Sequence, residues 1–247
     1  MSFLFWLFWG VGLLVSSLLG AYVVKKYREY GLFILGTFLA IYVVSANILV
    51  PRLINFEFFN LNFIIVTGAM IWPFTAQLTD MINEIYGKKA SYLAAAVAYM
   101  ANMMFVGFTL MAVHTPPFIA SVANEPFFTS YFGVAGRVLF ASMCSYTAAN
   151  FVDIQVFSKI KAWAMGRELS TMGLLGYATL RSSVSDGLNM VIDSAIFYTI
   201  AFIGTMPNTD LWALVVSSII AKVIISQIDL PFYWLFRLQT RDVSRTM

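Results

Sequence analysis

Seven stretches of mainly apolar residues, each long enough to cross a lipid bilayer, constrain the fold of this chain more than any other feature. A helix needs about 20 such residues to span the hydrocarbon core. Charged or proline-containing segments such as Lys25-Lys26-Tyr27-Arg28 and Thr115-Pro116-Pro117 separate the stretches. The candidate spans are Phe3–Val24, Gly31–Val50, Asn62–Tyr86, Ala90–Val113, Tyr131–Phe157, Arg181–Ile203 and Leu211–Phe236. The sequence therefore predicts an all-α protein, a polytopic bundle of transmembrane helices.

Composition supports a protein that is almost entirely embedded in the membrane. Only 11% of the residues are charged and 60% are hydrophobic, whereas a soluble domain has about 25% charged residues. The net charge of +3 is too small to indicate nucleic-acid binding. With one cysteine, Cys144, the chain has no metal-binding cysteine spacing, and it lacks the motifs for ATP hydrolysis or nucleophilic catalysis. We therefore expect neither an enzyme nor a bound cofactor or metal.

The basic residues predict the orientation of the chain. All but three of the 15 Lys and Arg residues lie in alternate loops or in the C-terminal tail, and the exceptions are Arg52, Arg137 and Lys222. Under the positive-inside rule, these loops and the tail are cytoplasmic and the N-terminus is outside. We expect one integral domain in the inner (plasma) membrane. It would comprise an additional N-terminal span and loop (1–30), a six-helix core (31–237) and a cytoplasmic tail (238–247).

Narrow stripes of polar residues interrupt four of the spans. On the third span, Gln77, Asp80, Asn83 and Glu84 recur at helical spacing and therefore share one face. The other stripes are Ser142, Tyr146, Asn150 and Asp153; Ser182, Ser185, Asp186, Asn189 and Asp193; and Ser218, Lys222, Ser226 and Asp229. A carboxylate in hydrocarbon costs roughly 2–3 kcal/mol, so these faces must point inward. The stripes predict a largely acidic interior.

Several of these residues also have purely structural interpretations, which the sequence leaves open. Glu84 and Lys88 have the spacing of an i, i+4 pair at a helix end. Asp193 and Lys222 lie near the middle of their spans and could form a buried pair that only holds helices together. On the first span, small residues four apart would let a helix of this bundle, or of another subunit, approach closely. They are Gly12, Ser16 and Gly20.

The third span also contains a family signature. The run from Trp72 to Ala90, which reads Trp-Pro-Phe-Thr-Ala-Gln-Leu-Thr-Asp-Met-Ile-Asn-Glu-Ile-Tyr-Gly-Lys-Lys-Ala, resembles the signature of the queuosine precursor transporter family, also called the putative vitamin uptake transporter family. The similarity extends over residues 45–236. Supporting segments are Ser45-Ala46-Asn47, Asp153-Ile154-Gln155-Val156-Phe157, Ser182-Ser183-Val184-Ser185-Asp186 and Leu230-Pro231-Phe232-Tyr233. The first span is additional to the usual six, and Ala149-Asn150 stand where many members have Gly-Gln.

The resemblance implies an importer of 7-deazaguanine bases, namely 7-cyano-7-deazaguanine and 7-aminomethyl-7-deazaguanine, which are salvaged for tRNA modification. A guanine-like edge presents adjacent N–H groups that one carboxylate can accept in a single plane. Asp80 or Glu84 would provide that carboxylate, and Lys222 or Asn150 would donate to the ring carbonyl.

Aromatic residues beside the acidic stripe would stack on the flat base. The expected base-binding residues are Trp72, Phe74, Gln77, Asp80, Asn83, Glu84, Asn150, Asp153, Asp186, Asn189, Asp193 and Lys222. The expected partners are the small-molecule base and the lipid bilayer, without nucleic acid.

Three classes of function remain open from the sequence. The first is a stand-alone carrier, driven by protons or by the substrate gradient alone. The second is the substrate-binding subunit of an ATP-driven vitamin uptake complex with separate energising subunits. The third is a scaffold whose polar stripes only hold helices together. A homo-oligomer also remains open.

Overall fold

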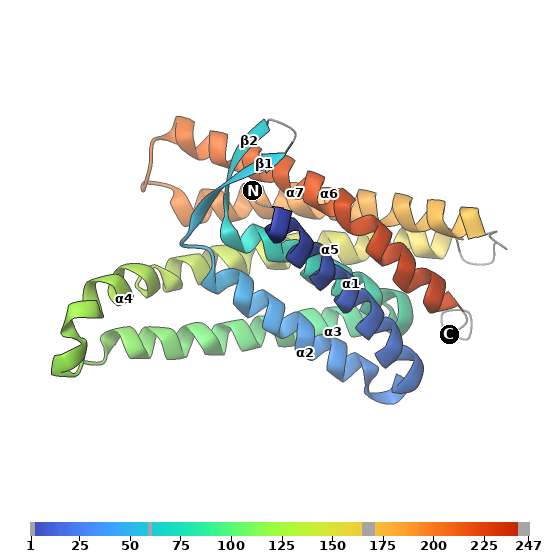
Figure 1. The fold of residues 1–247 in the computed structure, drawn as a ribbon, viewed down its shortest axis with the longest axis horizontal. Helices are drawn as coiled ribbons and strands as arrows, with labels where there is room; N and C mark the ends of the chain where they lie inside the picture. Colours follow the sequence, from blue (N-terminus) through green and yellow to red (C-terminus); the bar gives the residue numbers. More distant parts are fainter. Residues whose placement is uncertain (1–2, 59–60, 165–170, 242–247) are drawn as a thin grey trace.

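The computed structural model describes residues 3–58, 61–164 and 171–241 as a bundle of helices with one small sheet (Figure 1). Its elements are α1 (Phe3–Lys26), α2 (Arg28–Ile48), β1 (Leu53–Phe58), β2 (Leu61–Val66), η1 (Thr67–Ile71), α3 (Trp72–His114), η2 (Ile119–Asn124), α4 (Glu125–Phe132), α5 (Ala135–Ala164), α6 (Thr171–Phe202) and α7 (Asn208–Gln239). Within these residues, five helical stretches are long and apolar enough to cross a membrane: Trp6–Lys26, Arg28–Ile48, Thr67–His114, Val122–Ala162 and Asn208–Gln239.

The longest helix, α3, folds back on itself at Gly87. This glycine has φ 81° and ψ 176°, a backbone conformation that residues with a Cβ rarely adopt. Ser91 Oγ lies 3.5 Å from the carbonyl oxygen of Thr79, although twelve residues of straight helix would separate them by about 18 Å. Helix α3 therefore has two legs, 72–86 and 88–114, which we call the first and second legs (Figure 1). The predicted break at Gly87-Lys88-Lys89 is confirmed.

A β-hairpin precedes α3 where the sequence predicted the start of a membrane span. Strands β1 and β2 pair antiparallel, with Phe56 opposite Phe63. Phe56, Phe63 and Ile65 are buried in the same hydrophobic core, so one face of the hairpin packs inward. The predicted span Asn62–Tyr86 is wrong at its beginning, because its first residues form β2 and the helix starts at Trp72. The alternation of apolar and polar residues that signals a strand lies just before this span, in β1, where Asn55 and Glu57 separate Ile54, Phe56 and Phe58.

Helix α1 packs directly on the first leg of α3. Gln77 Nε2 donates a hydrogen bond of 2.8 Å to Ser17 Oγ. A Cβ added to Gly12 would lie only 3.1 Å from the ring of Phe74. The small-residue face of the first span therefore allows close packing within this chain.

Helices α5, α6 and α7 are neighbours and pack along one another (Figure 1). Helix α5 continues to Ala164 and α6 begins at Thr171, so helix occupies both ends of the polar run 158–179 that the sequence predicted as a break. The polar residues of these extra turns have partners inside the bundle, as described below. Arg167 and Arg245, which contributed to the predicted orientation, lie outside the described residues, as do residues 242–247 of the predicted tail.

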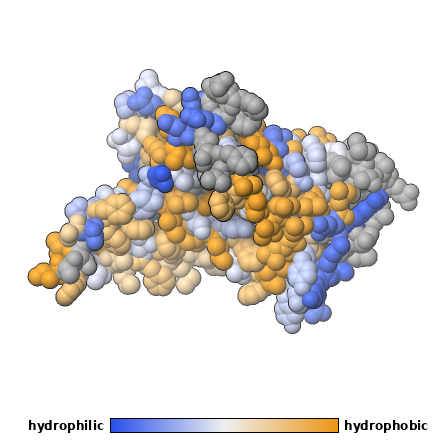
Figure 2. All heavy atoms as spheres, in the orientation of Figure 1, coloured by the Kyte–Doolittle hydropathy of each residue, from blue (hydrophilic) through white to orange (hydrophobic). Residues whose placement is uncertain are grey.

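Apolar side chains cover much of the outer face of the bundle (Figure 2). Phe8 and Phe33 are both 76% exposed, and Met111 is 64% exposed. Hydrophilic residues gather at the lower right of the view, near the connection between α1 and α2 and the end of α7, and at the upper left, near the start of α7 and the β-hairpin. Such a surface fits a helix bundle whose solvent is lipid.

Candidate functional site

A pocket of about 580 Å³ empty volume, part of which is open to the outside, lies where α2, η1, both legs of α3, α5, α6 and α7 meet. Its apolar wall comes mainly from α2 and η1. Its polar and aromatic lining residues are Asn47, Trp72, Thr75, Tyr99, Asn102, Ser142, Ser145, Tyr146, Asp193, Phe197 and Lys222. All four segments predicted to carry polar stripes therefore contribute to one pocket.

A buried ion pair forms part of the pocket wall. Lys222 Nζ of α7 lies 2.7 Å from Asp193 Oδ2 of α6. Trp72 Nε1 donates to the same carboxylate oxygen at 3.1 Å, and Lys222 Nζ stands 5.3 Å from the centre of the Trp72 ring. A charge buried this deeply needs a partner, and each of these two charges has one. The buried pair of Asp193 and Lys222 that their mid-span positions suggested is present, and it lies beside the pocket.

Aromatic rings form a flat part of the same wall. The rings of Trp72 and Tyr146 lie 6.2 Å apart with an angle of 22° between their planes. Tyr99 and Phe197 also line the pocket. Flat, parallel aromatic surfaces favour a planar ligand, because ring systems stack on one another with offset faces.

Two buried polar atoms of the pocket have no hydrogen-bond partner among the described residues. They are Asn102 Oδ1 and the hydroxyl of Tyr146. By contrast, the side chain of Asn47 accepts a hydrogen bond from Ser142 Oγ and donates one to the carbonyl oxygen of Val43. Buried polar atoms are nearly always hydrogen-bonded, so Asn102 and Tyr146 are suited to bind a polar ligand.

Three carboxylates form a second buried group, which we call the acidic cluster. It consists of Asp80 of α3, Asp153 of α5 and Asp186 of α6, whose carboxylate oxygens lie within 4.8 Å of one another. Asn189 lies next to Asp153. The three predicted stripes on α3, α5 and α6 therefore meet at this depth of the bundle.

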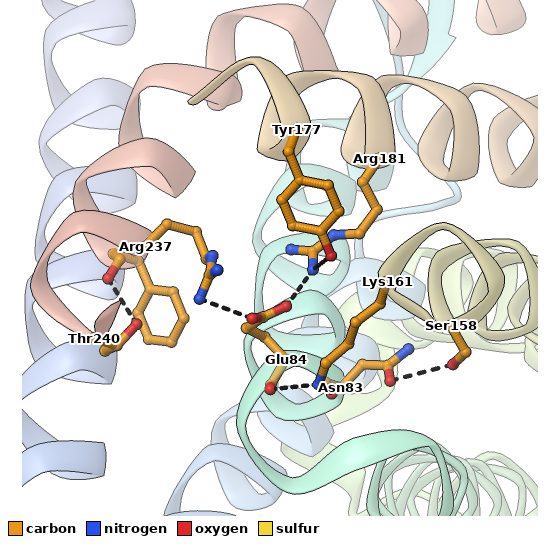
Figure 3. Close-up of polar contacts among 9 residues, drawn as sticks. Asn83, Glu84, Ser158, Lys161, Tyr177, Arg181, Arg237 and Thr240 are labelled. Atoms are coloured by element: carbon orange, nitrogen blue, oxygen red, sulfur yellow. Dashed lines mark hydrogen bonds and ion pairs between the residues drawn. The ribbon is translucent and has the colours of Figure 1, made fainter. Parts of the chain in front are cut away.

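A third group, the Glu84 cluster, lies at the other end of the first leg and consists of Glu84, Arg181 and Arg237 (Figure 3). Glu84 is bonded to Arg181 Nη1 and, at 2.7 Å, to Arg237 Nη1. The Arg181 guanidinium also donates to the hydroxyl of Tyr177 at 2.8 Å and lies 3.7 Å from the centre of the Phe157 ring. The carboxylate is therefore surrounded by donors on several sides.

Helical turns that lie beyond the predicted spans add contacts at the Glu84 end of the first leg. Lys161 Nζ donates to the carbonyl oxygens of Asn83 at 3.1 Å and of Glu84 at 2.7 Å (Figure 3). Lys88 donates instead to Gln155 Oε1 at 2.6 Å. The interpretation of Glu84 and Lys88 as an i, i+4 pair is thus wrong, because the turn at Gly87 removes Lys88 from the helix that carries Glu84.

The structure places three of the predicted base-binding residues, Trp72, Asp193 and Lys222, in the pocket. Asp80, Asp153, Asp186 and Asn189 lie in or beside the acidic cluster, and Asn83 and Glu84 lie at the Glu84 cluster. Gln77 binds Ser17 and, at 3.0 Å, Asp229. Phe74 packs against the rings of Trp9 and Tyr42, and Asn150 donates to the Tyr146 carbonyl oxygen of its own helix.

Sequence reasoning missed several residues at these sites. Asn102 lies 11 residues after Ser91 and 7 before Thr109, the other buried polar residues of the second leg, so this wide spacing was not recognised as a stripe. Asn47 and Tyr146 had signals, in the segment Ser45-Ala46-Asn47 and in the stripe of the fifth span. Arg181 and Arg237 were interpreted as loop charges, although their exposed fractions are 0% and 5%.

Comparison with known proteins gives two matches. A family model described as "Putative vitamin uptake transporter" matches residues 66–236. A protein of Bacillus subtilis (strain 168), described as "Probable queuosine precursor transporter", is 25% identical over 229 residues, which are 92% of this chain and 91% of that protein. No solved structure matches the chain. The family match includes the acidic cluster and the pocket wall from Val66 to Lys222.

Proposed function

The chain belongs to the putative vitamin uptake transporter family, and from this premise we propose that it imports 7-deazaguanine bases for tRNA modification. The substrates would be 7-cyano-7-deazaguanine and 7-aminomethyl-7-deazaguanine. The name of the Bacillus subtilis relative supports this substrate class. The apolar surface and the long helices support a multi-pass membrane protein.

The pocket between the helices supports the binding of one planar, polar molecule. It lies between helices and is partly open, and its lining combines apolar and aromatic side chains with a few polar groups, as is usual for small-molecule sites. The aromatic wall suits a bicyclic base, and the polar atoms lie around it. The observation that carries the proposal is the ion pair of Asp193 and Lys222 beside the stacked rings of Trp72 and Tyr146.

Each of these groups has a role toward a guanine-like edge. Among the described residues, both hydrogen bonds to Asp193 end on Oδ2, so Oδ1 would accept the N–H groups of the base. Lys222 would donate to the ring carbonyl, and Asn102 Oδ1 would accept a further N–H. Trp72 and Tyr146 would hold the plane of the ring.

Seven crossings would result if the two legs of α3 cross separately. Six of them, α1, α2, the two legs, α5 and α7, lie in the five apolar stretches; the seventh would be α6, which is not among those stretches but packs between α5 and α7. With the N-terminus outside, as the positive-inside rule predicts, the pocket would face the outside and the Glu84 cluster the cytoplasm. Such a molecule would bind the base from the outside while its cytoplasmic end is closed.

Queuosine in tRNA provides the test. A host that cannot make the precursor and lacks its own importer would express the chain and be fed nanomolar 7-cyano-7-deazaguanine. We expect queuosine to appear with the wild type and with Asp210→Asn, a matched change at an exposed carboxylate in the first turn of α7. We expect little queuosine with Asp193→Asn at equal membrane expression. No queuosine with the well-expressed wild type would contradict the proposed substrate.

Uptake by the purified chain in liposomes separates a carrier from a subunit of a larger complex. A stand-alone carrier takes up the base without other proteins. A substrate-binding subunit binds the base but transports it only when the energising subunits are present. A scaffold does neither, and its thermal stability does not change when the base is added.

A further inference from the structure

We propose that the N-terminal helix α1 sets the shape of the base pocket from outside, with Trp9 as its positioning residue; this inference rests on the proposed function. Gly68 and Ala69 of η1 and Trp72 of α3 line the pocket. Between them, the carbonyl oxygen of Met70 accepts a hydrogen bond of 2.9 Å from Trp9 Nε1. Trp9 itself is not one of the described residues that line the pocket, so its effect on the base must pass through η1.

The carbonyl oxygen of Met70 lies where its 3-10 helix lacks a donor. In such a helix a carbonyl accepts from the N–H three residues further along, and for Met70 that residue is Pro73. Proline has no N–H. The preceding carbonyl, of Ala69, does receive this bond, from the N–H of Trp72. Trp9 therefore provides from α1 the donor that the 3-10 turn cannot provide here.

Helix α1 packs along the face of η1 and the first leg that is turned away from the pocket. The contacting residues of this face follow at spacings of four, three and four, which place them on one side of a helix. They are Met70, Phe74, Gln77 and Met81, which lie against Trp9, Gly12, Ser17 and Gly20 of α1. By the same spacing Trp72 and Thr75, which line the pocket, lie on the opposite side. The thickness of one helix therefore separates α1 from the base.

The bond from Trp9 acts on the pocket through the position of Trp72, which follows Met70 by two residues. The Trp72 indole donates to Asp193 at 3.1 Å, and its ring lies at 22° to the ring of Tyr146. These contacts place it beside both the proposed acceptor of the base and the proposed stacking surface. A shift of η1 moves this indole relative to Asp193 and Tyr146. Holding η1 on α1 therefore preserves the geometry that the base meets.

This role belongs to a part of the chain that the family model does not describe. The model matches residues 66–236, so it includes Met70 and Trp72 but not α1. Trp9 is nevertheless only 8% exposed, and Ser17 is fully buried. The span that the sequence analysis counted as additional to the usual six is thus part of the support of the pocket in this chain.

Binding of 7-cyano-7-deazaguanine to the purified full-length chain, measured by calorimetry beside the melting temperature, tests this inference. Trp9→Phe keeps an aromatic ring but removes the donor to Met70. The matched control is Trp234→Phe, which removes a bond of 3.0 Å from another indole, to Thr179 Oγ1, at residues that are not among those lining the pocket. We expect Trp9→Phe to bind the base about fivefold more weakly, as for the loss of one hydrogen bond in the pocket. We expect Trp234→Phe to bind like the wild type, even where the two variants lose the same amount of thermal stability.

The possible outcomes separate the two proposals. Unchanged affinity in Trp9→Phe, or equal weakening in both variants, overturns the positioning role and leaves the proposed function intact. Absence of binding by the wild type overturns the proposed function and this inference with it. If Trp9→Phe does not fold, hydrogen exchange of the wild type decides. Saturating base should then slow amide exchange in residues 67–75 and in α1 around Trp9, and exchange in α1 that ignores the base overturns the inference.

Discussion

The two ends of the first leg of α3 contain buried ion pairs of different construction. At the pocket end, Asp193 meets one ammonium and one indole beside a cavity. At the other end, Glu84 meets two guanidiniums, one of which is also bonded to a tyrosine and lies against an aromatic ring. The first pair leaves room for a ligand, and the second is enclosed by protein.

This difference shows that the type of residue does not decide its role. Both carboxylates stand on apolar helices and both looked like ligand-binding groups in the sequence. Asp193 and Lys222 both line the pocket, so a change there leaves a charge beside a cavity. Glu84 is not among the residues that line this pocket, so a change there leaves two buried guanidiniums among protein groups.

The largest expected effect is at the enclosed end. Glu84→Gln removes the carboxylate that two guanidiniums share, and breaking a buried pair in this way costs about 3–5 kcal/mol of unfolding free energy. We expect poor membrane expression and a much lower melting temperature of the purified protein. Replacing Arg181 by Met in the same molecule should recover part of the loss. A melting temperature equal to that of the wild type would contradict the comparison.

The pocket end should lose transport before it loses stability. Asp193→Asn removes the charged acceptor of the base, and hydrogen bonds to charged groups contribute about 1.5–3 kcal/mol. We expect uptake to fall at least tenfold, measured as initial rate at low base concentration. The melting temperature should fall less than in Glu84→Gln. If Asp193→Asn lowered the melting temperature more than Glu84→Gln does, the comparison between the two ends would be reversed.

The turn that follows the enclosed end depends on one glycine. Gly87→Ala places a Cβ on a residue with φ 81° and ψ 176°. Although no atom lies within 4 Å of that Cβ, this backbone conformation is almost confined to glycine and costs other residues about 1–3 kcal/mol. We expect a moderate loss of thermal stability. Gly107→Ala is the matched control, because it lies inside the second leg with nothing within 4 Å and should gain stability from helix propensity. Equal thermal stability of the two variants would argue against a strained backbone at residue 87 in Gly87→Ala.

The smallest expected effect separates stacking from hydrogen bonding in the pocket. Trp72→Phe keeps an aromatic ring but loses the donor to Asp193, a contribution of about 1 kcal/mol. We expect binding of the base, measured by calorimetry, to weaken about fivefold. Trp212→Phe, at a side chain that is 59% exposed on α7, should bind like the wild type. Unchanged affinity in Trp72→Phe would assign the indole to packing alone.

Much of the fold follows from the length and period of the apolar segments. The helices are near their predicted positions because about 20 apolar residues have few other stable arrangements in lipid. The hairpin was missed because the length of an apolar window does not distinguish a strand from the first turns of a helix. The better indicator was β1, where the polar residues Asn55 and Glu57 alternate with Ile54, Phe56 and Phe58.

The site was only partly predictable, because helical spacing gives the face of a residue but not its depth relative to other helices. Asp80 and Asp193 were both recognised, yet they belong to separate groups in the structure. The partner of Glu84 could not be found locally either, since Arg181 stands 97 residues away. On its leg of α3, Asn102 is 7 and 11 residues from the other buried polar side chains, Thr109 and Ser91, so its sequence neighbours did not mark it as a pocket residue.

The contact between α1 and α3 has a consequence for biosynthesis. Ser17 is fully buried and binds Gln77, a residue made 60 positions later. When α1 leaves the ribosome and enters the bilayer, its partner does not yet exist, and the glycines of its small-residue face meet lipid. The face of the first helix that packs on α3 must therefore wait until the third helix has been inserted, and truncating the nascent chain before Gln77 should leave Ser17 accessible to lipid-phase crosslinkers.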